Sequence, residues 1–138
     1  MLSFKFVAIG GQVLSTYANY ENHINIAPEE REKLLNAIAK EKIRNVIFLT
    51  GDRHSSEISV ESRDGVRMYD FTVSPLTSGS YDHTAEPNTN RIRGKIYGEH
   101  AFATIEVTGS PKRRQAKLIL WDIEGKKVFE EVVTQQKY

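Results

Sequence analysis

Residues 51–57, Gly51-Asp52-Arg53-His54-Ser55-Ser56-Glu57, combine side chains that can do chemistry with a position that favours it. They follow Val46-Ile47-Phe48-Leu49, a run of consecutive apolar residues typical of a strand that is covered on both faces. Gly51 permits a sharp turn after that strand. If the chain then stays extended, Asp52 and His54 point to the same side, where a carboxylate oxygen and an imidazole nitrogen could bind one metal ion or two adjacent ions.

The chain contains no cysteine, so any metal site must use oxygen and imidazole ligands, and no disulfide can form. Oxygen and imidazole together suit Zn, Mn or Fe, and Ca where oxygen ligands dominate. The alternative for an isolated Asp-x-His pair is a capped turn that carries a surface histidine. Spacing alone leaves both interpretations of Asp52 and His54 open.

The first half of the chain predicts one strand–helix–strand unit that would position this pair. Residues 4–9 are typical of a strand that ends in a turn at Gly10-Gly11, and residues 15–27 are polar and predict a loop. Residues 28–41 predict a helix, because proline is tolerated at the first helical position and the acidic residues after it complement the helix dipole. In such a βαβ unit ligands bind beyond the carboxyl ends of the strands, where residues 51–57 lie.

The second half predicts antiparallel strands. Ile58 and Val60 alternate with polar residues, Asp64-Gly65 is a hairpin signal, and residues 66–73 are expected to return as a strand. Residues 74–90 form a loop long enough to suggest a function, because structureless loops above about 12 to 15 residues are uncommon. The last strands are expected near residues 101–107, 116–123 and 128–133, as an antiparallel meander.

Composition is that of one globular domain. The 138 residues are 39% hydrophobic and 27% charged, with a net charge of +1. This net charge gives no argument for attraction to nucleic acid or to an anionic membrane, and neither partner is expected. No stretch approaches the roughly 20 apolar residues of a membrane-spanning helix. Residues 1–18 superficially resemble a secretory signal, but Gly10-Gly11-Gln12 interrupts the apolar run, so a strand is favoured and the compartment is left open.

The string from Val46 to Ser56 resembles the Gly-Asp-x-His signature of the alkaline phosphatase D (PhoD-like) family of metallophosphoesterases. Further segments resemble the family in the same order, which makes the resemblance specific. These are residues 4–14, with Gln12-Val13-Leu14; residues 28–35, Pro28-Glu29-Glu30-Arg31-Glu32-Lys33-Leu34-Leu35; residues 72–79, Thr72-Val73-Ser74-Pro75-Leu76-Thr77-Ser78-Gly79; and the closing meander from Arg91.

The resemblance implies an α/β fold, namely the C-terminal half of a metallophosphoesterase-type α/β sandwich with one βαβ unit followed by the antiparallel meander. It implies a metal-dependent phosphoesterase acting on phosphomonoesters or phosphodiesters. Asp52 and His54 would be the catalytic metal ligands, for Ca, Fe, Mn or Zn ions. Arg53 would contact a substrate phosphate or point to solvent, with solvent preferred. His83 would lie near the substrate pocket or on a surface loop, with the surface loop preferred.

The family's other metal-binding motifs are not recognisable in these residues. Residues 1–138 are therefore expected to be a single C-terminal portion of a PhoD-like domain, weak or inactive alone, with the missing N-terminal portion or another copy of itself as a partner. The alternative is a catalytically inert fragment or repurposed subunit that keeps the fold. Asn22-His23 is a minor site candidate, and His100 is expected to be structural. Relatives are commonly exported, but this chain has no convincing signal peptide.

Overall fold

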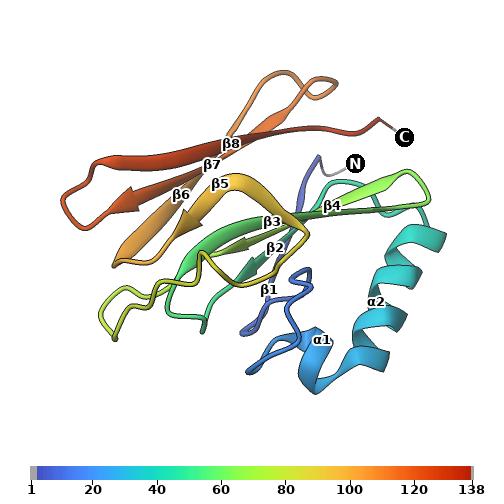
Figure 1. The fold of residues 1–138 in the computed structure, drawn as a ribbon. Helices are drawn as coiled ribbons and strands as arrows, with labels where there is room; N and C mark the ends of the chain where they lie inside the picture. Colours follow the sequence, from blue (N-terminus) through green and yellow to red (C-terminus); the bar gives the residue numbers. More distant parts are fainter. Residues whose placement is uncertain (1–2, 138) are drawn as a thin grey trace.

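The computed structural model describes residues 3–137, and three layers make up this part of the chain (Figure 1). One long helix covers a five-stranded sheet, and a three-stranded sheet covers the other face. The elements are β1 (Lys5–Ala8), α1 (His23–Ile26), α2 (Pro28–Lys40), β2 (Val46–Thr50), β3 (Ser56–Arg63), β4 (Val66–Thr72), β5 (Arg91–Tyr97), β6 (Ala101–Thr108), β7 (Gln115–Asp122) and β8 (Lys127–Thr134).

The larger sheet is mixed, with strand order β1-β2-β4-β3-β5. Strands β1, β2 and β4 run parallel, and β3 runs antiparallel to both of its neighbours. The predicted βαβ unit is therefore confirmed, and so is the hairpin between β3 and β4. Asp64 and Gly65 both have positive φ, of 49° and 79°, as a two-residue hairpin turn of this kind requires.

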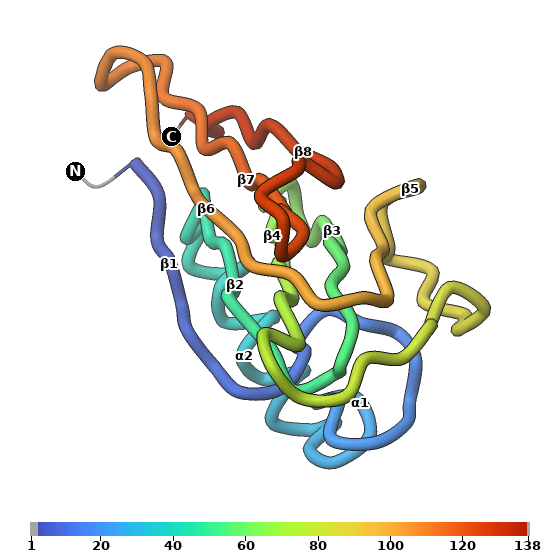
Figure 2. Tube along the Cα trace, turned by 90° about the vertical axis from the view of Figure 1, so that its left-hand side faces the viewer, coloured from blue at the N-terminus to red at the C-terminus, as the bar shows by residue number. Residues whose placement is uncertain are grey.

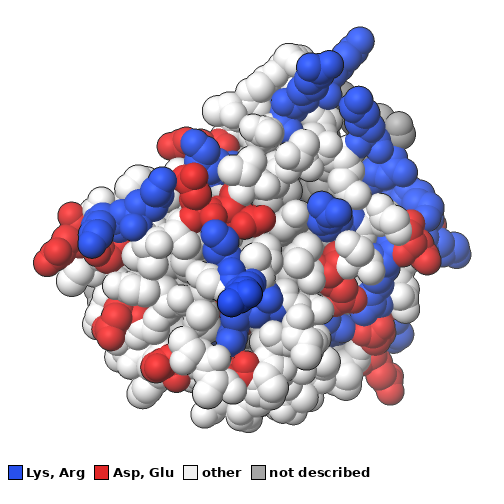
Figure 3. All heavy atoms as spheres, turned by 45° about the horizontal axis from the view of Figure 1, so that its top comes forward, with Lys and Arg blue, Asp and Glu red and all other residues white. Residues whose placement is uncertain are grey.

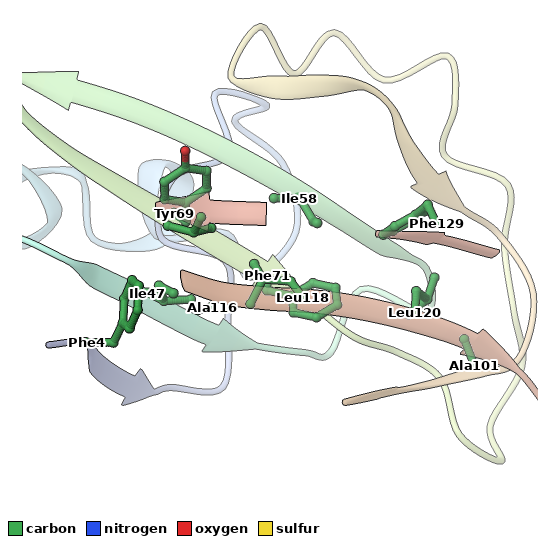
Figure 4. Packing of buried hydrophobic residues seen from close by; sticks show 11 residues of the cluster. Phe4, Ile47, Ile58, Tyr69, Phe71, Ala101, Ala116, Leu118, Leu120 and Phe129 are labelled. Atoms are coloured by element: carbon green, nitrogen blue, oxygen red, sulfur yellow. The ribbon is translucent and has the colours of Figure 1, made fainter. Parts of the chain in front are cut away.

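Two hydrophobic clusters hold the layers together. Helix α2 places Leu35 and Ile38 against one face of the mixed sheet, where Phe48 and Met68 are fully buried. The β6–β8 sheet covers the other face, as Figure 4 shows for Phe71 and its neighbours. The members of this second cluster are Phe4, Ile47, Ile58, Tyr69, Phe71, Ala101, Ala116, Leu118, Leu120, Phe129 and Val133.

The predicted fold class needs correction on one point. The antiparallel meander is confirmed, with β6, β7 and β8 in sequential order. The molecule is mostly β, however, and an α/β sandwich is not confirmed. The reason is that a second sheet, rather than helices, buries the far face of the mixed sheet.

Two local expectations were also wrong, although strand β1 forms as predicted. This strand lies at the sheet edge, where Phe6 and Val7 are 41% and 40% exposed. Strand β5 was not predicted, because its sequence is charged and contains Gly94. The polar segment 15–27 was expected to be a loop throughout, but it contains the one-turn helix α1.

The edges of the two sheets lie at the sides of the molecule. Figure 2 shows β1 and β6 on the same side, with β5 and β8 toward the other. On that second side Lys95 of β5 donates a hydrogen bond to the carbonyl oxygen of Glu130 and lies 3.8 Å from the Glu131 carboxylate, both on β8. Among the described residues no helix is long and apolar enough to cross a membrane.

The segment after β8 is hydrogen-bonded to distant parts of the chain. The Gln135 amide donates to the carbonyl oxygen of Arg114, the Asn45 side chain donates to the carbonyl oxygen of Gln136, and the Arg67 amide donates to the Gln136 side chain. In the view of Figure 3, Lys and Arg side chains gather along one side of the molecule. The net charge of +1 therefore conceals a basic region that the sequence totals did not predict.

Candidate functional site

The loops that follow the three parallel strands β1, β2 and β4 form one pocket of about 640 Å³. This is the end of the sheet where the βαβ pattern placed a ligand site. The loop after β1 contributes Tyr20 and Glu21, and the loop after β2 contributes residues 52–54. The loop after β4 contributes residues 81–83. The pocket thus combines segments up to 63 positions apart in the sequence, counted from residue 20 to residue 83.

The segment after β2 is not extended, which corrects the assumption behind the predicted Asp52–His54 pair. Asp52 and His54 both have positive φ, of 66° and 57°, and they flank a buried Arg53. The left-handed residues on either side of Arg53 turn the chain sharply, so the alternation of side chains expected for a strand does not apply. Asp52 and His54 nevertheless line the same pocket. Their convergence arises from the loop conformation and not from strand geometry.

His54 is held by contacts at its backbone and its ring. The His54 amide donates to Ser74 Oγ at 3.1 Å, and its carbonyl oxygen accepts from the Tyr81 amide at 2.9 Å. The ring Nδ1 is hydrogen-bonded to the carbonyl oxygen of Gly79. A carbonyl can only accept, so Nδ1 carries the proton and Nε2 keeps its lone pair in the neutral ring. This is the arrangement of a metal-binding imidazole whose other nitrogen is fixed by the protein.

Asp52 supplies an exposed carboxylate. Within residues 3–137 neither a hydrogen bond nor an ion pair engages its side chain. The pocket is also rich in acid: Glu21, Asp52 and Asp82 line it with a single arginine. The hydrogen bond from the Thr84 amide lowers the pKa of Asp82, so this carboxylate stays ionised at neutral pH. The lining therefore favours a bound cation.

The donor set fits two ligand positions of a metal shell and no more. Asp52 offers an unpaired carboxylate and His54 an oriented imidazole nitrogen in one pocket. Among the described residues no group of three or more His, Cys, Asp or Glu side chains is arranged to hold a metal ion. Four ligands are usual for zinc and six or more for calcium.

Arg53 does not point to solvent, which corrects the preferred interpretation of this residue. Its side chain is 5% exposed, and its Nη2 lies 2.5 and 2.6 Å from the two carboxylate oxygens of Glu86. The guanidinium carbon lies 5.0 Å from the centre of the Tyr20 ring, in a cation–π arrangement. Nε of Arg53 is buried without a partner in the described chain. A substrate contact by Arg53, which lines the pocket, stays a prediction.

His83 lies in the wall of the same pocket. Its side chain is 15% exposed and its Nδ1 is 2.6 Å from Glu86 Oε1, so Glu86 binds His83 and Arg53 together. The Tyr81 ring meets the His83 ring edge-on, with centroids 6.2 Å apart. The location near the pocket was one of the two interpretations of His83, and its contact with substrate stays a prediction.

The other histidine candidates lie elsewhere. Asn22 precedes α1 and His23 begins it, and neither lines the pocket. Nδ1 of His23 is 2.9 Å from the carbonyl oxygen of Gln12. Nε2 of His100 is 2.7 Å from the carbonyl oxygen of Ser78, a contact that ties the loop after β4 to the start of β6.

Beneath the pocket lies a buried polar network that sequence reasoning missed. Glu57, 2% exposed at the start of β3, accepts hydrogen bonds from Gln12, Asn88 and Arg91. These partners come from the loops after β1 and β4 and from β5. Alternation with Ile58 and Val60 put Glu57 on the polar face of β3, so no local pattern in the sequence indicated that this carboxylate is buried.

Asp70 on β4 fixes the loops at the pocket from the same face of the sheet as Glu57. Its Oδ2 accepts from the amides of Val13 and Leu14 at 2.7 and 2.8 Å, and its Oδ1 accepts from the Thr50 hydroxyl at 2.6 Å. Burial raises the pKa of this carboxyl, although the Thr50 hydroxyl and the two amides oppose the shift. Asp70 thus joins the loop after β1 to the last residue of β2, next to Gly51.

Gly98 sets the position of the pocket loop that carries Tyr81. A Cβ at residue 98 would lie 3.0 Å from both the Tyr81 carbonyl oxygen and Asp82 Cα. Gly98→Ala should therefore displace residues 81–82 and cost about 1 kcal/mol of folding free energy. Amide NMR shifts around Tyr81 and His54 would report the displacement. Gly79→Ala is the matched control, because its Cβ would stop 3.7 Å from the Tyr81 hydroxyl, an ordinary contact. Equal shifts in both variants would contradict this role of Gly98.

Similarity to a known protein family extends over all the residues that line the pocket. The family model described as PhoD-like phosphatase matches residues 11–116, which include all three pocket loops. A search of curated proteins returned no match.

Proposed function

The chain belongs to the PhoD-like phosphatase family, which supports a phosphatase-type function, and we propose that its pocket is part of a metal-dependent phosphoesterase site. The proposed reaction is hydrolysis of a phosphomonoester or phosphodiester. The observation that carries the proposal is the convergence of Asp52 and His54 on one acidic pocket. A bound metal ion would supply the acidity that activates water and the charge that stabilises the phosphoryl group.

The proposed roles of the chain's own residues follow from their contacts. Asp52 and His54 bind the metal through the free carboxylate and through Nε2, whose orientation the contact of Nδ1 with Gly79 fixes. Arg53 and His83 are proposed to contact phosphoryl oxygens, with Glu86 holding both side chains in place. The metal is Ca, Fe, Mn or Zn. The remaining ligands are proposed to come from a partner polypeptide or from another copy of this chain.

Metal titration tests the ligand roles. We expect the ¹⁵N-labelled chain to bind Mn²⁺, with paramagnetic broadening centred on residues 52–54. Asp52→Ala and His54→Ala should each weaken binding by at least about tenfold, because each removes a direct ligand. His100→Ala is the control, since His100 does not line this pocket. Broadening that is the same in all four proteins would contradict the metal site and favour an inert or repurposed module that keeps the fold.

Turnover tests whether the shell is completed from outside. With Ca, Mn, Fe or Zn added, we expect the isolated chain to hydrolyse little p-nitrophenyl phosphate or bis(p-nitrophenyl) phosphate. Two side chains do not fill the coordination sphere of any of these ions. Robust hydrolysis that Asp52→Ala or His54→Ala abolishes would show instead that the chain forms a working site by itself.

A further inference from the structure

Two tyrosine rings at the pocket are exposed although both are large and apolar in body. Tyr20 is 55% exposed and Tyr81 is 59% exposed, and both line the pocket that holds Asp52 and His54. Tyr20 comes from the loop after β1 and Tyr81 from the loop after β4, and the two residues lie 61 positions apart in the sequence. Exposed aromatic rings in the wall of a polar pocket supply flat apolar surface where a ligand can reach it.

Tyr20 is held in an unusual backbone conformation. Its φ of 48° lies in the left-handed region, which a bulky residue rarely adopts. Hydrogen bonds on both sides maintain this conformation: the Tyr20 amide donates to Asn19 Oδ1 at 2.9 Å, and Asn25 Nδ2 donates to the Tyr20 carbonyl oxygen at 2.8 Å. The result is that the ring lies against the Arg53 guanidinium, 5.0 Å from it.

Tyr81 is fixed directly to the proposed metal ligand. Its amide donates to the His54 carbonyl oxygen, and the ring centroids of Tyr81 and His54 are 5.4 Å apart. The same ring meets His83 edge-on. Both tyrosines therefore present their rings at little further cost in conformational entropy on binding.

We propose that Tyr20 and Tyr81 select phosphate esters whose alcohol part contains a planar aromatic or heteroaromatic ring, such as an aryl or nucleoside ester. This inference rests on the proposed function, because the phosphoryl group must bind at residues 52–54 and 83 for the alcohol group to reach the tyrosines. Aromatic surfaces interact through dispersion and through the ring quadrupole, so a flat ring gains more here than an aliphatic ring of similar size. Tyr20 and Tyr81 are accordingly residues that determine specificity.

The central comparison is between phenyl phosphate and cyclohexyl phosphate, whose rings are of similar size but differ in planarity. Phenyl phosphate, cyclohexyl phosphate and inorganic phosphate would each be titrated into the ¹⁵N-labelled chain in the presence of Ca²⁺, with adenosine 5′-monophosphate as the heteroaromatic probe. We expect phenyl phosphate to bind about 3- to 10-fold more tightly than cyclohexyl phosphate. Tyr20→Leu or Tyr81→Leu should bring the ratio near one, Tyr81→Phe should preserve it, and Phe102→Leu, at an exposed aromatic residue outside the pocket, should leave it unchanged.

The outcomes separate this inference from the proposed function. Equal affinity for phenyl and cyclohexyl phosphate, with inorganic phosphate still bound at the pocket, would overturn the aromatic preference alone. A preference that survives both leucine substitutions would overturn the assignment to these tyrosines. Absence of binding by all the ligands, phosphate included, would overturn the inference and the proposed function together. Tighter binding of adenosine monophosphate than of phenyl phosphate would support the heteroaromatic class.

Discussion

Asp70→Ala is expected to lower the free energy of unfolding by about 3 kcal/mol, because it removes the carboxylate that accepts from three buried donors. The donors are the amides of Val13 and Leu14 and the Thr50 hydroxyl, and Asp70 itself is 1% exposed. Thr50 retains its contact with Thr72, at 2.8 Å, so the two amides account for most of the loss. Urea unfolding followed by circular dichroism would measure the change.

Asp70→Asn is the matched control, because asparagine keeps an acceptor for the two amides and can donate to Thr50. It should cost less than about 1 kcal/mol, since both partners of each bond can still be satisfied. If alanine and asparagine destabilise the chain equally, Asp70 does not hold these loops through its oxygens.

The same pair of proteins predicts a pH dependence. Burial raises the pKa of Asp70 above its ordinary value of 3.8 in the folded chain. The folded state therefore binds the proton more tightly than the unfolded state. The stabilisation that protonated Asp70 contributes to the folded state is fully present below pH 3.8. It is lost as the pH rises through the pKa of Asp70 in the folded chain. Asp70→Asn should consequently gain stability relative to the wild type as the pH rises through this window. A constant difference across the window would contradict the raised pKa.

Glu86→Leu should destabilise the chain by about 3 kcal/mol, because it leaves a buried guanidinium without its counter-charge. The Arg53 side chain is 5% exposed, and Glu86, 12% exposed in its side chain, is its carboxylate partner among the described residues. Loss of Glu86 also frees His83, whose Nδ1 it binds. Chemical unfolding at neutral pH measures the change.

A double-mutant cycle isolates the Arg53–Glu86 interaction. Arg53→Met combined with Glu86→Leu replaces both charges with apolar groups, and the double variant should lose clearly less stability than the sum of the two single variants. His83→Gln, which removes the second and more exposed partner of Glu86, should cost less than about 1.5 kcal/mol. Additive effects of Arg53→Met and Glu86→Leu would show that the pair is not energetically coupled.

Asp70 and Glu86 both fix loops at the pocket, but they join different pairs of segments. Asp70 joins the loop after β1 to the end of β2, and Glu86 joins the loop after β4 to Arg53 in the loop after β2. Both act on the segment that contains Asp52 and His54. Changes at either residue should therefore also weaken Mn²⁺ binding, even though neither side chain is a proposed ligand.

The sequence was sufficient for features that depend on neighbouring residues. Proline followed by acidic residues marked the start of α2 at Pro28, and Asp64-Gly65 marked the β3–β4 turn, because helix starts and two-residue turns are governed by local backbone preferences. The apolar run 46–49 placed the buried strand, and the parallel βαβ arrangement placed the pocket beyond its end. The string that follows identified the family.

Features that depend on contacts between residues far apart in the sequence were decided only by the tertiary structure. Arg53 is buried because Glu86, 33 positions away, neutralises it, and no local pattern reports that pairing. Strand β5 forms because β3 offers it an edge, despite the charges and the glycine in its sequence. Asp52 and His54 converge through left-handed loop residues instead of through an extended strand. Local preferences thus fixed helix α2, the β3–β4 turn and most of the strands. Pairing with β3 decided β5, and burial and pairing between remote loops decided which side chains face the pocket.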